Sequence, residues 1–232
     1  MNIYIFLLCY NESVLLPHTI NHYKQNIPNC IITILDNEST DNSVTIAKSL
    51  GCNVQTFSTN NMLDEIKQTN LKNNCWKHIK NGWIIVADMD EFLCITEEEL
   101  YQELNNETTI LSIQGLEMIG ESNNLNLTDI KLSDITKSYP SDIESKNICF
   151  YRNDIIEMNY NSGGHKCSPE GKLKFSVNIY YNKHMNKLGL TYLTNKIVSR
   201  YNRSENMRLQ NLCVHYTNNI EQIKKNYYDS FI

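Results

Sequence analysis

The sequence of 232 residues lacks the hallmarks of several protein classes. It has no block of basic residues, and its formal net charge of −5 argues against general nucleic-acid binding. It has no CxxC pair, and its eight cysteines are dispersed, which indicates reduced, partly buried thiols rather than a disulfide framework or a zinc site. No apolar run approaches the roughly 18 residues of a membrane span.

The sequence also lacks a secretory signal at its start. Residues 1–10 are apolar but few, they include no basic residue and no small-residue cleavage site, and Asn11-Glu12-Ser13 ends the run. We interpret this run as a first strand and expect a cytoplasmic protein. The length and the hydrophobic fraction of 41% predict one domain with a sizeable core.

Glycine-rich phosphate loops are absent as well. Neither G-x-G-x-x-G nor G-x-x-x-x-G-K-[ST] occurs among the eight glycines. A phosphate group would therefore have to be held by a metal ion, by side chains or by other backbone groups.

What is present is an alternation of buried strands and helices through the first hundred residues. Continuous apolar runs predict strands over residues 3–9, 30–35, 52–57 and 83–87. Helices are predicted over residues 14–25, from the polar loop 36–41 to residue 50, and over 62–80. This order predicts a mostly parallel sheet flanked by helices.

The second half of the chain has a weaker pattern. It predicts helices over 97–105 and 221–231, and strands over 108–114, 148–152, 173–181 and 211–216. Residues 115–146 are polar, with few apolar anchors. A structureless stretch of that length is unusual inside a compact domain and is often functional.

Asp88-Met89-Asp90 follows the apolar run 83–87 and is the most informative motif. Carboxylates at i and i+2, where a strand ends, point the same way, into the crevice where open α/β sheets bind ligands. Two close carboxylates resist ionising together unless a cation joins them. We therefore predict a divalent metal site, of the kind that holds a diphosphate.

Two further polar pairs follow predicted strands. Asn11-Glu12 follows the first strand and Asp36-Asn37 the second. Either pair alone could be an ordinary turn or helix cap, but three clusters on one edge of a parallel sheet favour a site. Asp36 could accept hydrogen bonds from a base imide or a ribose hydroxyl.

Three segments resemble the successive motifs of GT-A-type glycosyltransferases, in the family 2-like branch with an Asp-x-Asp-Glu-Phe signature. They are Tyr10-Asn11-Glu12, residues 36–43 and residues 86–93. The resemblance implies a three-layer α/β/α GT-A-type fold with a mostly parallel central sheet. It implies one domain over 1–232, with a nucleotide-sugar-binding half (1–95) and an acceptor-binding half with a terminal helix (96–232).

The resemblance also implies an activity. It is the transfer of a hexosyl or related glycosyl group from a UDP- or GDP-sugar, with Mn²⁺ or Mg²⁺, to a hydroxyl of a glycan, protein or lipid. The donor-binding residues that it implies are Asn11, Glu12, Asp36, Asn37, Gln68, Asn73, Asp88, Met89 and Lys166. Gln68 and Asn73 match a "Q…N" pair on the helix before the metal strand.

The metal ligands implied by the resemblance are Asp88, Asp90 and His215, the last within a late "His-Tyr" element. Residues 147–165 resemble a "K-x-I-x-R-P … H" stretch, whose His165 competes with His215 or contacts substrate. The family's Lys-Ser pair near the diphosphate is replaced here by Asn219-Ile220, for which Lys224 or Lys225 could substitute.

The residue that acts as the catalytic base is the assignment that the sequence determines least. An inverting transfer needs a carboxylate to take the acceptor's proton, and Glu117 and Glu121 are the candidates, with His165 as a further catalytic residue. An inactive nucleotide-sugar-binding or scaffolding module is the alternative function. An Asp-x-Asp phosphatase is disfavoured, because Phe92 replaces the expected Thr or Val and the motif follows the fourth strand.

Overall fold

The computed structural model of the chain describes residues 1–120 and 131–230. Its main sheet has nine strands in the order β3-β2-β1-β4-β8-β6-β11-β5, with β7 beside β6. The strands of the first half are β1 (Ile3–Cys9), β2 (Cys30–Asp36), β3 (Asn53–Thr56) and β4 (Trp83–Asp88). They are mutually parallel, as the apolar runs predict, and Ile3 pairs with both Cys30 and Trp83.

Three helices connect these strands: α1 (Leu16–Asn26), α2 (Ser43–Ser49) and α3 (Glu65–Asn74). Ser13, which follows the first apolar run and could cap a helix, does not cap α1. The residue before the helix is Leu15, which makes no side-chain capping hydrogen bond, and the Ser13 amide donates to Asp41 Oδ2 at 3.0 Å. The third helix is shorter than predicted. Asp64 caps its start by accepting from the Lys67 amide at 2.8 Å.

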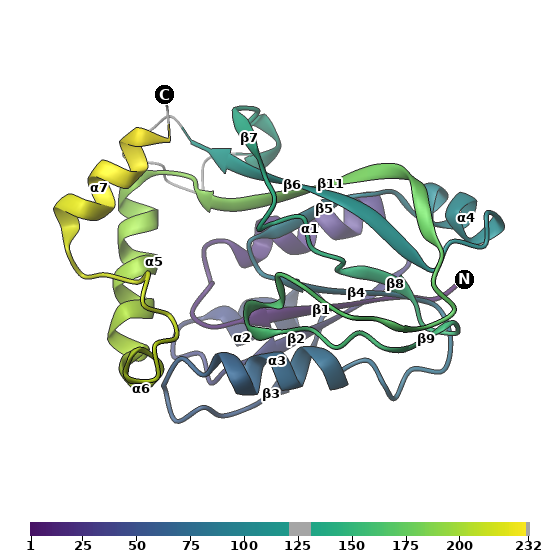
Figure 1. Cartoon of the computed structure of the whole chain (residues 1–232), viewed down its shortest axis with the longest axis horizontal. Coiled ribbons are helices and arrows are strands. Elements are labelled where there is room, and N and C mark those ends of the chain that lie inside the picture. The colour runs from purple at the N-terminus through teal and green to yellow at the C-terminus, as the bar shows by residue number, and fades with distance from the viewer. Residues whose placement is uncertain (121–130, 231–232) are drawn as a thin grey trace.

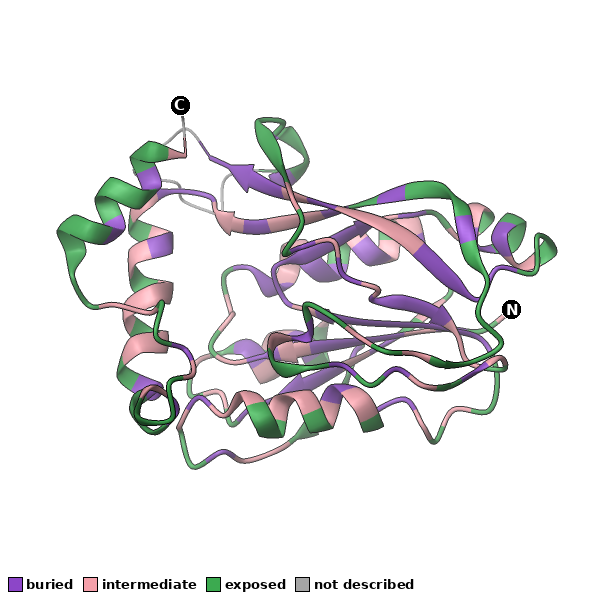
Figure 2. Cartoon of the chain, in the orientation of Figure 1, coloured by how far each residue is buried: buried purple, intermediate pink, exposed green. Residues whose placement is uncertain are grey.

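The core lies on both faces of the parallel strands (Figure 2). Odd-numbered residues of β1, such as Ile5, pack with α1 and α2, whereas Phe6 packs with Trp76, just after α3. A strand buried on both faces has to be apolar at every position, which is why these strands read as continuous runs. The result is the predicted three-layer α/β/α arrangement.

The second half extends the sheet. Its elements are β5 (Glu91–Cys94), α4 (Glu97–Asn105), β6 (Ile110–Ile119), β7 (Ser138–Ser141), β8 (Cys149–Tyr151), β9 (Ile155–Glu157), β10 (Glu170–Gly171) and β11 (Phe175–Lys187). β6 and β11 are parallel and lie side by side above β1 and β4 (Figure 1). The prediction of a structureless segment from residue 115 is wrong up to Ile119 and at β7, because β6 continues there, hydrogen-bonded to β7 and β11.

The chain then forms α5 (Leu190–Arg203), α6 (Glu205–Leu209) and α7 (Ile220–Asp229). The predicted strand over 211–216 is wrong, because Asn211 and Cys213 have φ of 60° and 54°, in the left-handed region that strands exclude. Cys213 instead packs beside Leu63 and Met207 in a small cluster.

The helix α5 was not predicted from the sequence. It stands across the ends of the sheet towards which β1 runs, on the left in Figure 1. Its C-terminal end is held there, because the Leu63 amide donates to the Arg203 carbonyl at 2.8 Å. Among the described residues, no helix combines the length and the apolarity that crossing a membrane requires.

Candidate active site

Asn11 organises the loop after β2. It has a φ of 52°, a conformation that Asn tolerates better than most residues. Its side-chain carbonyl accepts from the backbone amide of Thr40 at 2.7 Å and from that of Asp41 at 3.3 Å. The backbone amide of Asn11 donates to Ser39 Oγ at 2.9 Å. Asn11, a predicted donor-binding residue, therefore joins two loops at the carboxyl edge.

Asp36 and Asn37 are buried at the end of β2. Both Asp36 carboxylate oxygens accept from the Ser39 amide at 3.3 Å. Asn37 Oδ1 accepts from the Thr59 hydroxyl at 3.0 Å, but Asn37 Nδ2 has no partner among the described residues. A buried amide donor without an acceptor costs free energy, so this nitrogen marks a place where a ligand acceptor would be favourable.

The two aspartates do not share a strand, contrary to the simplest expectation. Asp88 ends β4, a turn holds Met89 and Asp90, and β5 begins at Glu91. Met89, predicted to contact the donor, is buried in the main core, and its carbonyl accepts from Thr19 Oγ1 at 2.7 Å.

Asp88 is paired with two lysines. Its Oδ1 lies 2.7 Å from Lys72 Nζ and its Oδ2 lies 3.8 Å from Lys146 Nζ. Burial alone would raise the pKa of Asp88, but these ammonium groups outweigh it and lower the pKa to about 2. The Asp88 amide also donates to Glu91 Oε2 at 2.8 Å, which fixes the turn.

Asp90 is more deeply buried and contacts a histidine and a lysine. His184 Nε2 lies 3.2 Å from Asp90 Oδ2, and Lys196 Nζ contacts the same oxygen. Burial would raise the pKa of Asp90, but Lys196 and His184 hold it well below its usual range. His184 was not among the predicted site residues.

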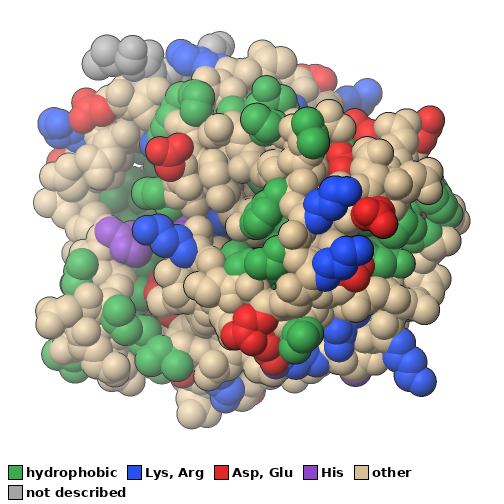
Figure 3. Space-filling model, turned by 45° about the vertical axis from the view of Figure 1, so that its right-hand side comes forward, with side chains coloured by type: hydrophobic (Ala, Val, Ile, Leu, Met, Phe, Trp, Pro, Cys, Tyr) green, Lys and Arg blue, Asp and Glu red, His purple; other side chains and the backbone are tan. Residues whose placement is uncertain are grey.

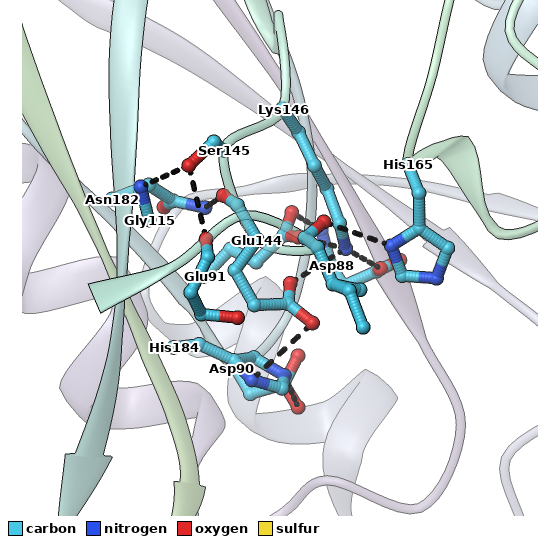
Figure 4. A network of polar contacts seen from close by, with 12 residues as sticks. Asp88, Asp90, Glu91, Gly115, Glu144, Ser145, Lys146, His165, Asn182 and His184 are labelled. Atoms are coloured by element: carbon cyan, nitrogen blue, oxygen red, sulfur yellow. Dashed lines mark hydrogen bonds and ion pairs between the residues drawn. The ribbon is translucent and has the colours of Figure 1, made fainter. Parts of the chain in front are cut away.

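The ring of His184 is held from its other side (Figure 4). Nδ1 lies 2.9 Å from Glu117 Oε2 and 3.7 Å from Glu144 Oε1. Burial alone would lower the pKa of His184, but Asp90 and Glu117 outweigh it and raise the pKa to about 10. Glu117, a predicted base, thus contacts the histidine that faces Asp90.

Lys146 forms ion pairs with two acidic side chains, Glu91 and Glu144, close to Asp88 (Figure 4). It is buried, 2.5 Å from Glu91 Oε1 and 2.9 Å from Glu144 Oε2. These contacts raise its pKa well above the usual value, although burial alone would lower it. Lys146 is therefore held in its charged form.

The helix α5 brings two further cations to the site. Lys196 and Arg200 are one turn apart and face the same way. Lys196 Nζ lies 3.9 Å from Glu12 Oε1 and 3.4 Å from the Tyr192 hydroxyl, and Arg200 donates to the Tyr216 hydroxyl at 3.4 Å. Burial raises the pKa of Glu12, although Lys196 partly offsets it.

The described charges of the site do not balance. Six carboxylates face four basic side chains and His184, so the carboxylates outnumber the positive charges by one when His184 is protonated and by two when it is neutral, as a metal ligand must be. The carboxylates are those of Glu12, Asp88, Asp90, Glu91, Glu117 and Glu144, and the cations are Lys72, Lys146, Lys196 and Arg200. The imbalance favours binding of a further cation.

The donor set fits a divalent metal ion. Asp90 Oδ2 and His184 Nε2 are 3.2 Å apart, which suits two neighbouring ligands of one ion. A metal-binding histidine usually donates its other ring N–H to a carboxylate, and Glu117 stands at that position. A carboxylate with an imidazole suits Mn²⁺ better than Mg²⁺.

His215, the predicted third ligand, lies elsewhere. It is exposed in the turn after α6, tilted against the Tyr216 ring at 4.1 Å. None of its described contacts is with Asp88 or Asp90. His165 is also exposed, with Nδ1 3.1 Å from the Ile143 carbonyl.

The remaining predicted residues are spread around the site. Gln68 lies half-buried on α3, and Lys166 is exposed beside His165. Both ends of the Asn73 amide bind the Tyr160 backbone, at 2.8 and 3.1 Å, so Asn73 holds that segment against α3. Glu121 lies outside the described residues.

A hollow is visible on the side of the C-terminal helices, with a histidine and a basic side chain at its rim (Figure 3). Tyr10, just after β1, lines a pocket of about 500 Å³ with α5. Arg203 lies 3.2 Å over the Tyr10 ring and donates to the Asn61 carbonyl at 3.1 Å. The crevice at the carboxyl edge is thus bounded by α5.

Sequence reasoning missed six site residues: Lys72, Glu144, Lys146, His184, Lys196 and Arg200. Lys146 directly precedes the stretch 147–165, two positions before Ile148, so it matches the Lys of "K-x-I" and could have been found there. Lys196 and Arg200 had a signal in the apolar spacing of Leu190, Leu193 and Ile197, which indicates a helix. His184 had none, because it follows a predicted strand without any motif.

The strand order, the three layers and the acidic clusters at one sheet edge define a GT-A-type fold. The family model described as glycosyl transferase family 2 matches residues 4–156, well over half of the chain. The chain therefore belongs to glycosyl transferase family 2. The predicted membership of family 2 is thereby confirmed, at the level of the family and not of the Asp-x-Asp-Glu-Phe branch.

Individual likenesses are more distant. Protein RfbJ from Shigella flexneri is 40% identical over 53 residues, which are 23% of this chain and 41% of that protein. TarS 1-349 from S. aureus is 14% identical with a TM-score of 0.47, over 86% of this chain and 65% of that one. Its complex with UDP gives 13% identity, a TM-score of 0.49 and coverages of 85% and 66%. The chain thus spans under two thirds of these proteins.

Proposed function

We propose that the protein transfers a glycosyl group from a nucleotide-diphospho-sugar to an acceptor hydroxyl. Family membership supports the reaction class. The observation that carries the proposal is the buried Asp90–His184 pair, 3.2 Å apart at the carboxyl edge and oriented by Glu117. Ligands of open α/β sheets bind at this edge.

The nucleoside end of the donor is assigned to the end of β2. Asn37 Nδ2, which has no partner among the described residues, donates to a carbonyl of the base. Asp36 accepts from a base imide or a ribose hydroxyl in the same place. Because uracil and guanine both present carbonyl acceptors, UDP- and GDP-sugars both remain candidates.

The diphosphate end is assigned to the Asp88–Asp90 turn. Asp90 and His184 would hold a divalent cation, with Asp88 beside them, so His184 takes the role first given to His215. When bound, the cation supplies neutralisation of the charge that develops on the departing nucleoside diphosphate. Lys72 and Lys146 keep Asp88 ionised beside it.

We assign Glu117 a positioning role. Its Oε2 is engaged by His184 at 2.9 Å, so it orients the ring that faces Asp90. The base that receives the acceptor's proton stays a prediction, with Glu121 as a candidate. The acceptor, a glycan, protein or lipid, is assigned to the half of the chain from residue 96 onwards.

Incubation of the purified protein with UDP- and GDP-sugars and Mn²⁺ tests the proposal. We expect nucleotide binding by calorimetry and slow release of UDP or GDP from one donor. If the protein bound none of these nucleotides, the assignment of the donor site would be contradicted. Binding without turnover, over a panel of acceptors, would favour the inactive nucleotide-sugar-binding module.

Asp90→Asn should reduce the metal-dependent rate at least about a hundredfold, because it removes a charged ligand and leaves Lys196 and His184 unpaired. The matched control is Asp229→Asn, which breaks an exposed pair with Lys225 on α7. A rate in Asp90→Asn equal to that of the control would contradict the assignment.

A further inference from the structure

Lys196 competes with a metal ion for one carboxylate oxygen. Its ammonium group contacts Asp90 Oδ2, the same oxygen that His184 Nε2 faces at 3.2 Å. The Lys196 side chain is 8% exposed and that of Asp90 is 3% exposed. A divalent ion between Asp90 and His184 would meet a buried ammonium group at contact distance.

The ammonium group cannot stay beside such an ion. Two cations in a poorly solvated site repel each other strongly, and here both would have to contact the same oxygen, Asp90 Oδ2. Lys196 has a flexible four-carbon stem, so its head can move while α5 stays in place. Metal binding at Asp90 therefore requires Lys196 to leave it.

The displaced ammonium group has few other partners. Glu12 Oε1 lies 3.9 Å away and the Tyr192 hydroxyl lies 3.4 Å away, both beyond a good charge-assisted hydrogen bond. Burial makes an unpaired ammonium group expensive. The bound donor would bring a new anion to the same edge, beside Lys196 and Arg200 of α5.

We propose that Lys196 exchanges partners as the donor site fills. It neutralises Asp90 while the site is empty, and it binds the donor's diphosphate oxygens once a divalent cation has taken its place at Asp90. This inference rests on the proposed function for its second half. Its first half concerns only the protein and the metal ion.

Lys196→Gln tests the two halves of the proposal separately. Without nucleotide, the variant should bind Mn²⁺ about tenfold more tightly than the wild type, because a competing cation is gone; electron paramagnetic resonance of free Mn²⁺ measures this. With saturating Mn²⁺, UDP and GDP should bind about tenfold more weakly, since a charge-assisted hydrogen bond is lost. Calorimetry measures this second change.

Lys174→Gln is the matched control, because it removes a lysine from an exposed 3.6 Å pair with Glu107. It should leave both affinities unchanged. Lys196→Arg keeps the charge, so it should restore weak Mn²⁺ binding and show that any effect of Lys196→Gln is not a general loss of structure.

Unchanged or weaker Mn²⁺ binding by Lys196→Gln would overturn the competition. Unchanged nucleotide binding would overturn the second half, and would mean that Lys196 moves to Glu12 instead. If the wild type bound neither UDP nor GDP, the proposed function would fail, yet the Mn²⁺ titrations would still decide whether Lys196 competes at Asp90.

Discussion

Several residues of the candidate site are held in place by contacts with other side chains of the site. Glu117 orients His184, His184 faces Asp90, and Asn11 fixes the loop that follows β2. Asp88 and Asp90 were recognisable in the sequence because they directly follow a buried run. His184 lies more than ninety residues further on, so only the paired strands β5 and β11 bring it to Asp90.

The pH dependence of stability tests Asp41. Burial would raise the pKa of Asp41, but hydrogen bonds from Ser43 and Ser13 outweigh it and lower the pKa below its ordinary 3.8. A depressed folded-state pKa stabilises the native state above about pH 4 and loses that contribution as the pH falls further. Urea unfolding between pH 6 and 3 should therefore show a smaller loss of stability for Asp41→Asn than for the wild type.

Asp229→Asn is the control, because its exposed pair with Lys225 contributes little. Parallel pH profiles for the wild type and Asp41→Asn would show that the loop around Asp41 is not held by its carboxylate.

At the scale of elements, the parallel strands and α4 were predictable from local signals. β1, β2 and β4 are apolar at nearly every position, and Thr96 and Glu99 form a capping box at the start of α4. By contrast, β6 was predicted to end too early, at residue 114, because the chain from Gly115 to about Lys146 has few apolar anchors. The burial of Glu117 is explained by His184, which lies opposite it on the adjacent strand β11.

The helix α5 should depend on a small core of its own. Leu193 packs with Ile223 and Tyr227 of α7, and all three are buried. Leu193→Ala should lower the free energy of unfolding by about 2–3 kcal/mol, through lost transfer free energy and a cavity. Urea denaturation measures this change.

Leu209→Ala is the matched control, since Leu209 is 79% exposed. An equal effect of the two substitutions would contradict the packing of α5 on α7.

At the scale of the whole molecule, the described residues form one nine-stranded sheet with a core on each face, beside the small β9–β10 sheet. Trp83 lies in the core shared with α1 and α2, and Trp76 lies in the core on the face of α3. Neighbouring residues of β4 belong to opposite cores, so neither core can unfold alone without breaking the same strand.

Single-tryptophan variants test this coupling. Trp76→Phe retains Trp83 as the fluorescence reporter, and Trp83→Phe retains Trp76. Each variant's fluorescence transition in urea should coincide with its own circular-dichroism transition, as two-state unfolding requires. Separate midpoints within either variant would contradict the prediction of one domain.

The sequence by itself determined the buried parallel strands, the acidic clusters at their carboxyl ends and the family. These depend on residues close together in the chain, where strand periodicity and motif spacing act. The tertiary structure alone decided which charges meet there: His184 at Asp90, Lys72 and Lys146 at Asp88, and Lys196 from a helix across the sheet end. Such contacts depend on how distant segments pack, because a charge becomes a partner only when folding buries it beside another.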